Sequence, residues 1–445
     1  MFAALAAALM ALGACTAFDD ALPLSPRERI VPRVDAHQHL MSAAAQALTA
    51  PEPDLPAIAL PAELAALLAE RERVAGNPPV GDLFSDDALV VQLQEGRWRR
   101  GRGAVDRYNN NILKGVRFVA KAYALGDRSG WIAGTVRVPE ANDDSLGFLL
   151  GLTRDGAGPW RIASEALNEV RPPVYDRVVD ADRVIELLDD AGIRHGVLLS
   201  VAYWFGSPMR NPPVQDELGK TRAENDWTVA EAARHPDRLV PFCSVNPMRD
   251  YAIAELERCA AMPAVRGMKI HLANSRIDLR DAGQLARLRD FFRAADRHRM
   301  AIVMHARTPQ GFGVEHAAIV LEELLPAAPD VPVQIAHMAS SWGAAAFFAD
   351  AIAGGDPRTR NLYFDVTQAV PADVAARTPA YRAGLVATLR RIGLARVFHG
   401  SDLAVSSNPS PREWWKAMRA LPLSDDELRT VAKNLPPYLR RRAAT

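Results

Sequence analysis

Short apolar runs alternate with amphipathic stretches along the later part of the chain. The apolar runs lie at Gly196–Tyr203, Leu239–Asn246, Val265–Leu272, Ala301–Ala306, Val331–Met338, Leu362–Val370 and Arg396–Leu403. The patterns between them that suit helices include Asp182–Ala191, Glu224–Arg234, Ile253–Ala261, Ala282–His298, Val314–Leu325 and Pro379–Ile392. Near-continuous apolar strands alternating with helices are typical of a parallel sheet that is buried on both faces.

With Ile30–Leu40 as a further strand, the apolar runs predict eight β/α units, which is an α/β fold of the (β/α)8 TIM-barrel type. Such a barrel builds its active site at the C-terminal ends of its strands. Two closing helices are expected at Trp414–Leu421 and Ser424–Leu435. Ser424 would cap the second helix, because Glu427 follows three residues later.

About 130 residues separate the first strand from the next barrel element, far more than a loop in a β/α unit needs. The pattern predicts a separate inserted domain over residues 55–168. It begins with a helix at Ala62–Ala75. Strands are expected at Ala88–Gln94, Trp131–Val138, Leu146–Thr153 and Trp160–Ser164, and the turn at residues 154–158 would join the last two as a hairpin.

Several predicted barrel strands end in side chains that bind metals. The residues are His37 and His39, then Lys269 and His271, His305, His337 and finally Asp402. Side chains at positions i and i+2 of a strand face the same way, so His37 and His39 can hold one ion together. One histidine on an apolar run means little, but a set of such strand ends predicts a metal site at the mouth of the barrel.

The barrel resembles the amidohydrolase superfamily, in particular its branch related to aminocarboxymuconate semialdehyde decarboxylase. The resemblance rests on Asp-x-His-x-His in the first strand, Gly-x-Lys-x-His, two later histidines at strand ends, and Gly-Ser-Asp. It covers residues 30–40 and 171–435.

The resemblance implies a role for each of these residues. His37, His39 and His305 would bind the metal together with Asp402, which would also act as the general base. His337 would be an acid/base that orients the substrate, or a ligand of a second metal.

Imidazole and carboxylate ligands suit Zn²⁺ or Mn²⁺, and an open coordination position lets the ion activate water. In binuclear members of the superfamily a carbamylated lysine, here Lys269, bridges two metals. We expect one divalent metal rather than two, with Zn²⁺ ahead of Mn²⁺. Lys269 would then hold a substrate carboxylate, and His271 would either contact substrate or support its neighbours in the site from behind. Arg307 is expected to bind a substrate carboxylate, because a guanidinium can do so through two hydrogen bonds.

The inserted domain resembles the NTF2-like, SnoaL-type cone fold. It contains no histidine and no cysteine, which argues against a second metal or a histidine-based catalyst in it. The resemblance leaves its role open between oligomerisation, shaping the mouth of the barrel, and catalysis of its own.

The formal net charge is zero, so nothing indicates nucleic acid as a partner, and a small molecule is the expected substrate. Residues 1–14 are mostly apolar and resemble a signal peptide ending in a lipobox at Cys15, although no Lys or Arg precedes the apolar run. This predicts an exported, periplasmic protein attached to the membrane through lipidated Cys15. The other two cysteines, Cys243 and Cys259, are expected to be buried free thiols, with a single bridge as the alternative.

The leading prediction is a metal-dependent hydrolase that cleaves a carboxylic ester, lactone or amide in a small molecule. A metal-dependent decarboxylase or hydratase of a small unsaturated or aromatic acid is the first alternative. A non-catalytic binding protein with a vestigial barrel is the second, and the intact ligand set including Asp402 counts against it.

Overall fold

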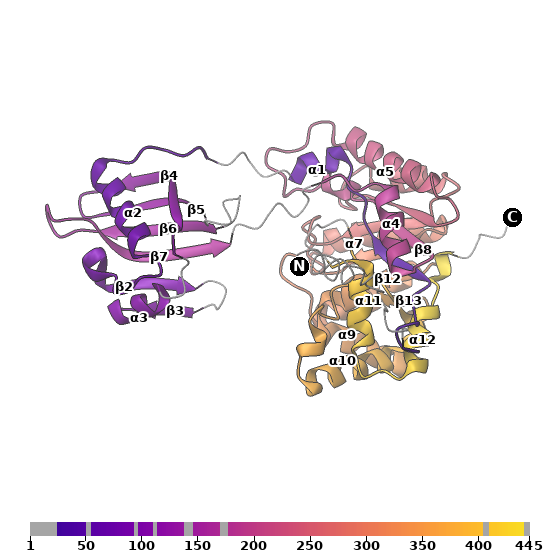
Figure 1. Cartoon of the computed structure of the whole chain (residues 1–445). Coiled ribbons are helices and arrows are strands. Elements are labelled where there is room, and N and C mark those ends of the chain that lie inside the picture. Colours follow the sequence, from indigo (N-terminus) through magenta and orange to yellow (C-terminus); the bar gives the residue numbers. More distant parts are fainter. Residues whose placement is uncertain are drawn as a thin grey trace, which may run out of the picture. The chain divides into compact units, whose positions relative to one another are not determined.

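The computed structural model describes residues 25–49, 55–92, 97–109, 114–137, 146–169, 177–403 and 409–439. The chain divides into two compact units (Figure 1). The first unit runs to Leu48 and resumes at Arg177, and the second comprises Thr49–Asp176. The predicted signal peptide and Cys15 lie outside the described residues.

The first unit is built on eight strands, each hydrogen-bonded in parallel to its neighbours in the order β1-β8-β9-β10-β11-β12-β13-β14. They are β1 (Val34–Gln38), β8 (His195–Leu199), β9 (Leu239–Ser244), β10 (Gly267–His271), β11 (Ala301–His305), β12 (Val333–Ile335), β13 (Leu362–Asp365) and β14 (Val397–Phe398). The Ala36 amide donates to His399 O at 2.8 Å and the His39 amide donates to Leu403 O at 2.7 Å, which joins the last strand to the first. The predicted (β/α)8 barrel is confirmed.

Helices separate and surround these strands. They are α1 (Ala43–Thr49), α4 (Ala181–Ala191), α5 (Glu217–Ala233), α6 (Ala252–Ala260), α7 (Ala282–Arg297), α8 (Val314–Ile319), α9 (Trp342–Ala353), α10 (Pro379–Ile392), α11 (Pro411–Arg419) and α12 (Asp425–Lys433). The capping box at the start of α12 forms as predicted, with the Ser424 hydroxyl accepting from the Glu427 amide.

Strand alternation separates two kinds of side chain. Met268 and Ile270 of β10 belong to the large apolar core that includes the helices. Ala301 and Val303 of β11 belong to a second apolar cluster, in the barrel interior. Because the side-chain period of a strand is two, Lys269 falls on the opposite face of β10 from Met268 and Ile270. Lys269 therefore points into the barrel.

The second unit is an α+β domain with a six-stranded sheet in the order β3-β2-β7-β6-β5-β4. Its elements are α2 (Ala62–Val74), β2 (Phe84–Gln92), β3 (Arg97–Arg100), α3 (Arg102–Asn109), β4 (Arg117–Leu125), β5 (Ser129–Arg137), β6 (Leu146–Thr153) and β7 (Arg161–Glu169). β6 and β7 form the predicted antiparallel hairpin. The expected strands missed β3 and β4, and the NTF2-like assignment stays a prediction.

The expectation of free thiols is wrong. Cys243 on β9 and Cys259 on α6 form a disulfide, with their Cα atoms 6.4 Å apart. The two elements follow each other along the chain and pack together, so both sulfur atoms lie in the same buried layer.

Candidate metal centre

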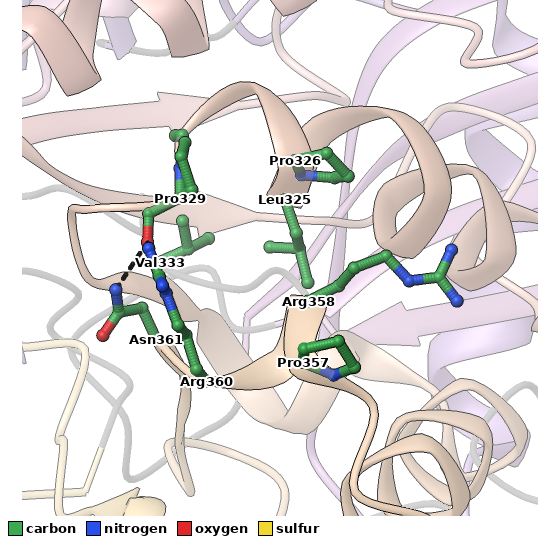
Figure 2. Close-up of a pocket in the computed structure, with 9 residues that line it drawn as sticks. Leu325, Pro326, Pro329, Val333, Pro357, Arg358, Arg360 and Asn361 are labelled. Carbon is green, nitrogen blue, oxygen red and sulfur yellow. Dashed lines mark hydrogen bonds between the residues drawn. The ribbon is translucent and has the colours of Figure 1, made fainter.

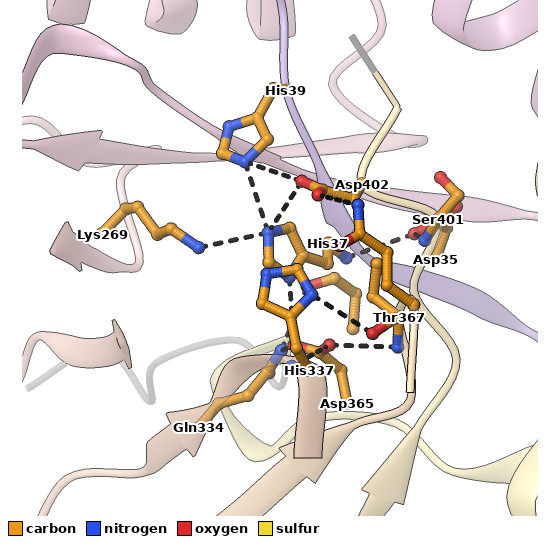
Figure 3. Close-up of polar contacts among 12 residues, drawn as sticks. Asp35, His37, His39, Lys269, Gln334, His337, Asp365, Thr367, Ser401 and Asp402 are labelled. Atoms are coloured by element: carbon orange, nitrogen blue, oxygen red, sulfur yellow. Dashed lines mark hydrogen bonds and ion pairs between the residues drawn. The ribbon is translucent and has the colours of Figure 1, made fainter. Parts of the chain in front are cut away.

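Three side chains converge where the first and last barrel strands meet (Figure 3). The Nε2 atoms of His37 and His39 lie 3.3 Å apart. Each of them also lies 3.3 Å from Oδ1 of Asp402. His37, His39 and Asp402 were all predicted as metal ligands, and the fold brings them together from positions far apart in the sequence.

The partners of the two imidazoles show that this cluster fits a cation. His37 Nδ1 lies 3.1 Å from Oδ2 of Asp365, and His39 Nδ1 lies 2.6 Å from the carbonyl oxygen of Leu199. Both partners accept hydrogen bonds, so both Nδ1 atoms carry the proton. In the neutral rings both Nε2 atoms then present lone pairs to each other and to a carboxylate oxygen. A divalent ion bound between them would relieve this repulsion.

Asp365 is the residue that holds His37 in place. It is fully buried at the end of β13 and its Oδ1 accepts from the backbone amide of His337 at 3.0 Å. Its Oδ2 accepts from Nε2 of Gln334 at 2.8 Å as well as from His37. Burial opposes ionisation of Asp365, but the neighbouring His37 outweighs it and holds the pKa of the carboxyl well below its usual range. Asp365 therefore orients a ligand from behind, as is common in metal sites.

Lys269 lies beside the same cluster. Its Nζ is 3.1 Å from His37 Nε2, and the side chain is buried in the barrel. Burial lowers the pKa of Lys269 to about 8, although Asp402 and Asp365 favour its charged form. Among the described residues, two groups of three side chains place possible metal-binding atoms close together, and His37 belongs to both. The first group also contains His39 and Asp402, and the second also contains His337 and Asp365. Since His37 Nδ1 is occupied by Asp365, this favours one ion over two.

The remaining histidines form a row beside His37, His39 and Asp402. His271 stacks on His305 with ring centroids 3.9 Å apart, and His305 lies 4.7 Å from His337. His337 lies 4.9 Å from His37. Burial lowers the pKa of both His271 and His305 well below the usual range, so these rings are neutral near pH 7. His305 belongs to neither converging group, and its role as a ligand stays a prediction.

A cavity of about 310 Å³ opens beside this row. It is lined by His305, Arg307, His337, Met338, Ser340, Ser341, Trp342, Gln368, Ala369, Pro371 and Tyr381. None of these lining residues is acidic, and the exposed Arg307 supplies the positive charge. The cavity wall therefore suits an anionic molecule that has a flat apolar part, which Trp342 and Tyr381 can contact.

The backbone around His337 differs from the expected strand at Val331–Met338. β12 ends at Ile335, and the chain then makes a left-handed turn in which four consecutive residues, none of them glycine, have φ between 49° and 61°. They are His337, Met338, Ala339 and Ser340. Each such conformation costs on the order of 1 kcal/mol for a residue with a Cβ atom. The turn points His337 toward the metal cluster, and its cost is the kind of strain that functional sites hold.

A second cavity, of about 280 Å³, lies at the opposite end of the barrel, where β12 and β13 begin (Figure 2). Its polar side chains are already paired. Arg360 and Asn361 both donate to the carbonyl oxygen of Pro329, and Arg358 pairs with Asp356. Because these polar groups are already hydrogen-bonded or ion-paired, they are less able to bind a ligand than the groups of the candidate metal centre are.

Sequence reasoning missed three residues that support the centre. Asp365 and Gln334 fix His37, and Gln368 donates from Nε2 to Oδ2 of Asp402 at 3.0 Å. The acidic residue at the end of the apolar run Leu362–Phe364 was a usable signal for Asp365. Gln334, in the middle of a strand, had no distinguishing pattern.

A model of a family described as "Amidohydrolase" matches residues 212–434, half of the chain. The chain belongs to the amidohydrolase family. The expected resemblance is thus confirmed for the barrel. The match covers Lys269, His271, His305, His337 and Asp402, and it begins after His37 and His39. No curated protein matches this amidohydrolase.

Solved structures resemble this amidohydrolase at low identity. 5-carboxyvanillate decarboxylase from Sphingomonas paucimobilis is 18% identical with a TM-score of 0.45, over 60% of this chain and 85% of that one. 2,6-dihydroxybenzoate decarboxylase from Rhizobium is 16% identical with a TM-score of 0.43, over 58% and 87%. IDCase from Metarhizium anisopliae in its apo form is 14% identical with a TM-score of 0.46, over 92% and 96%. In the part of the amidohydrolase that the structure describes, no helix is long and apolar enough to cross a membrane.

Proposed function

We propose that this amidohydrolase is a metal-dependent carboxy-lyase that removes a carboxylate from a small unsaturated or aromatic acid. The observation that carries the proposal is the cavity beside the metal centre, whose lining combines Arg307, histidines and aromatic side chains with no acidic residue. An acid that carries a flat unsaturated group matches both the charge and the shape of this wall. One Zn²⁺ or Mn²⁺ ion is proposed at His37, His39 and Asp402.

The side chains divide the work of such a reaction. A bound divalent ion would polarise a substrate oxygen and draw electron density away from the bond that breaks. Arg307 would hold a carboxylate at the rim of the cavity. His337 Nδ1 lies 3.2 Å from the carbonyl oxygen of Thr367 and therefore carries its proton, which leaves Nε2 as the atom that exchanges protons. When carbon dioxide leaves, the bonding electrons stay on the substrate carbon, and protonated His337 would supply the proton that this carbon takes up.

Hydrolysis of an ester, lactone or amide is the second candidate, because of the position of Asp402. Its Oδ1 faces both ligand histidines and its Oδ2 is held by Gln368. The histidines hold the pKa of Asp402 well below the usual range against the effect of burial, so the carboxylate is ionised. An ionised carboxylate in this position suits a general base that takes a proton from an attacking water molecule.

One experiment separates the two reactions. The enzyme, loaded with Zn²⁺ or Mn²⁺, would be incubated in H₂¹⁸O with hydroxybenzoic acids, unsaturated dicarboxylic acids, lactones and esters. Loss of carbon dioxide without ¹⁸O in the organic product supports the carboxy-lyase. Incorporation of ¹⁸O into a new carboxylate without loss of carbon dioxide supports hydrolysis and overturns the first proposal. Turnover by Asp402→Asn at the wild-type rate would contradict both mechanisms.

We also propose that the protein acts outside the cytoplasm, anchored through lipidated Cys15. The lipobox-like sequence and the Cys243–Cys259 disulfide support this, because disulfides persist in oxidising compartments. Labelling of the wild-type protein with a fatty acid in the cell, and loss of the label in Cys15→Ser, is the expected result. Equal recovery of both proteins in the cytoplasmic fraction without label would contradict it.

A further inference from the structure

The C-terminal segment of the described chain enters the barrel at the end opposite the metal centre. Tyr438, in the short turn Pro437–Leu439, is buried in the apolar cluster of the barrel interior. This cluster includes Val34 and Ala301, the first residues of β1 and β11, which places it at the base of the barrel. The ring of Tyr438 packs edge-on against Phe242, with centroids 4.9 Å apart. Tyr438 therefore closes the base of the barrel.

A line of hydrogen bonds runs from Tyr438 to the metal ligand His37. The Tyr438 hydroxyl donates to Oε1 of Gln334 at 2.6 Å. Nε2 of Gln334 donates to Oδ2 of Asp365 at 2.8 Å, and the same oxygen accepts from Nδ1 of His37 at 3.1 Å. Figure 3 shows Gln334 and Asp365 on the side of His37 away from His39. Every member of this line is buried.

The Tyr438 hydroxyl acts together with two acceptors at the other end of the amide to fix which way the Gln334 amide points. Nε2 of Gln334 lies between two acceptors, Oδ2 of Asp365 and the carbonyl oxygen of Ala36 at 3.3 Å. Burial raises the pKa of Tyr438 well above the usual range, so the hydroxyl keeps its proton and can donate. If the amide turned over, its oxygen would face the Asp365 carboxylate and its NH₂ group would face the tyrosine.

We propose that Tyr438 is a positioning residue for the metal centre, acting from the base of the barrel through Gln334 and Asp365 on His37. Without the hydroxyl, Oε1 of Gln334 becomes a buried acceptor with no donor, and the amide loses the contact that holds it from the base of the barrel. An amide that is no longer held at its oxygen can shift and weaken its hydrogen bond to Asp365, and Asp365 fixes the ring of His37. Changes to such supporting partners typically lower metal affinity by about 10- to 100-fold.

The test compares two variants of the full-length protein that each remove one hydrogen-bonded tyrosine hydroxyl. Tyr438→Phe is expected to lower the affinity for Zn²⁺ by about tenfold in competition with a chelator. It is also expected to alter the visible absorption of the Co²⁺-loaded protein, which reports ligand geometry. The control is Tyr251→Phe, whose hydroxyl bonds Glu217 outside the barrel interior. The control should keep the wild-type affinity and spectrum.

A double-mutant cycle separates positioning from packing. Gln334→Met removes the link, so adding Tyr438→Phe to it should leave the affinity for Zn²⁺ within about twofold of Gln334→Met alone. Independent, multiplying effects would overturn the proposal, and so would an unchanged affinity and Co²⁺ spectrum in Tyr438→Phe. A wild-type protein that binds no metal would overturn the metal centre as a whole, a result distinct from wild-type binding that is insensitive to Tyr438.

Discussion

The two units of the chain each bury a charged cluster, and the two clusters are completed in different ways. In the inserted unit, Arg71 donates to both oxygens of Glu165 at 2.6 and 2.7 Å and to Oδ1 of Asn109 at 3.1 Å. Asn109 in turn donates to the carbonyl oxygen of Val74. In the barrel, two imidazole lone pairs and a carboxylate oxygen face one another. A cluster whose charged groups hydrogen-bond one another stabilises the fold. A cluster in which several acceptor atoms face one another can instead bind a cation.

The two units also differ in which residue types adopt left-handed backbone conformations. Within the described part of the inserted unit, left-handed φ angles occur at glycines, such as Gly81 and Gly156. In the barrel they also occur at residues with side chains around the metal centre, among them His337, Gln368 and Asp402. These conformations cost little free energy at the glycines of the inserted unit. In the barrel they occur at residues with a Cβ atom and strain the backbone around the candidate site.

The largest effect is expected from removing the converging acceptors. The double variant His37→Ala/His39→Ala should lose the bound metal and reduce turnover by about 10⁴-fold or more, because both substitutions delete ligands. Elemental analysis of protein purified without added metal gives the equivalents per chain. A full equivalent retained by the double variant would mean that the cluster is not the metal site.

In the inserted unit, removing one charge of the buried cluster is expected to lower stability and to leave the metal content unchanged. Glu165→Gln leaves the Arg71 charge buried without its counter-ion, and should destabilise that unit by about 3–5 kcal/mol. Urea unfolding followed by tryptophan fluorescence measures this, with metal content as the second readout. Metal content should stay at the wild-type value. The pair Arg71→Met/Glu165→Leu, which removes both charges, is the matched control and should recover most of the loss.

Glu224, in the barrel unit, is a buried carboxyl with only part of its hydrogen bonds made. Its Oε2 accepts from the Ser42 hydroxyl at 2.5 Å, whereas its Oε1 is buried without a hydrogen-bond partner among the described residues. Burial raises the pKa of Glu224 from 4.5 to about 7. The folded protein thus keeps a proton that the unfolded chain releases, and the free energy of unfolding should fall as pH rises from about 4.5 to 7.

Glu224→Gln should remove this part of the pH dependence, which amounts to about 2 kcal/mol. Urea unfolding of the wild type and the variant at pH 5 and pH 7 gives the comparison. The difference in stability between variant and wild type should grow in favour of the variant toward pH 7. Parallel pH profiles for the two proteins would show that Glu224 ionises as an ordinary carboxyl.

The smallest effects concern the backbone. Ala339→Gly should raise the free energy of unfolding by about 0.5 kcal/mol, because glycine adopts a φ of 61° without steric cost. Gly156→Ala in the inserted unit should lower it by about 1 kcal/mol. The φ of Gly156 is 57° and its surroundings have room for a Cβ atom, so that change isolates the backbone effect. Equal signs for the two substitutions would contradict the difference between the units.

The eight strands and most barrel helices follow from the sequence because buried parallel strands and amphipathic helices have strong local patterns. Pro379–Ile392 matches α10 residue for residue. The convergence of His37, His39 and Asp402 could be predicted because strand ends in a barrel share one mouth. The supporting roles of Gln334 and Tyr438 were not predicted from the sequence. An isolated polar residue within a strand and a tyrosine in a terminal turn acquire their hydrogen-bond partners only in the folded barrel. β4 alternates weakly, with Ala and Lys in its centre, and gave no strand signal.

The seam between the first and last barrel strands has a consequence for how the enzyme matures. His37 O accepts from the Asp402 amide at 2.7 Å, and Asp35 Oδ1 accepts from the Ser401 amide at 3.1 Å across 366 positions of sequence. The predicted ligands stand on both sides of this seam, so the folding chain has no complete site until its last strand has docked against the first. An ion that binds there would therefore bind late in folding, and it would then hold the two edges of the barrel together and slow their separation.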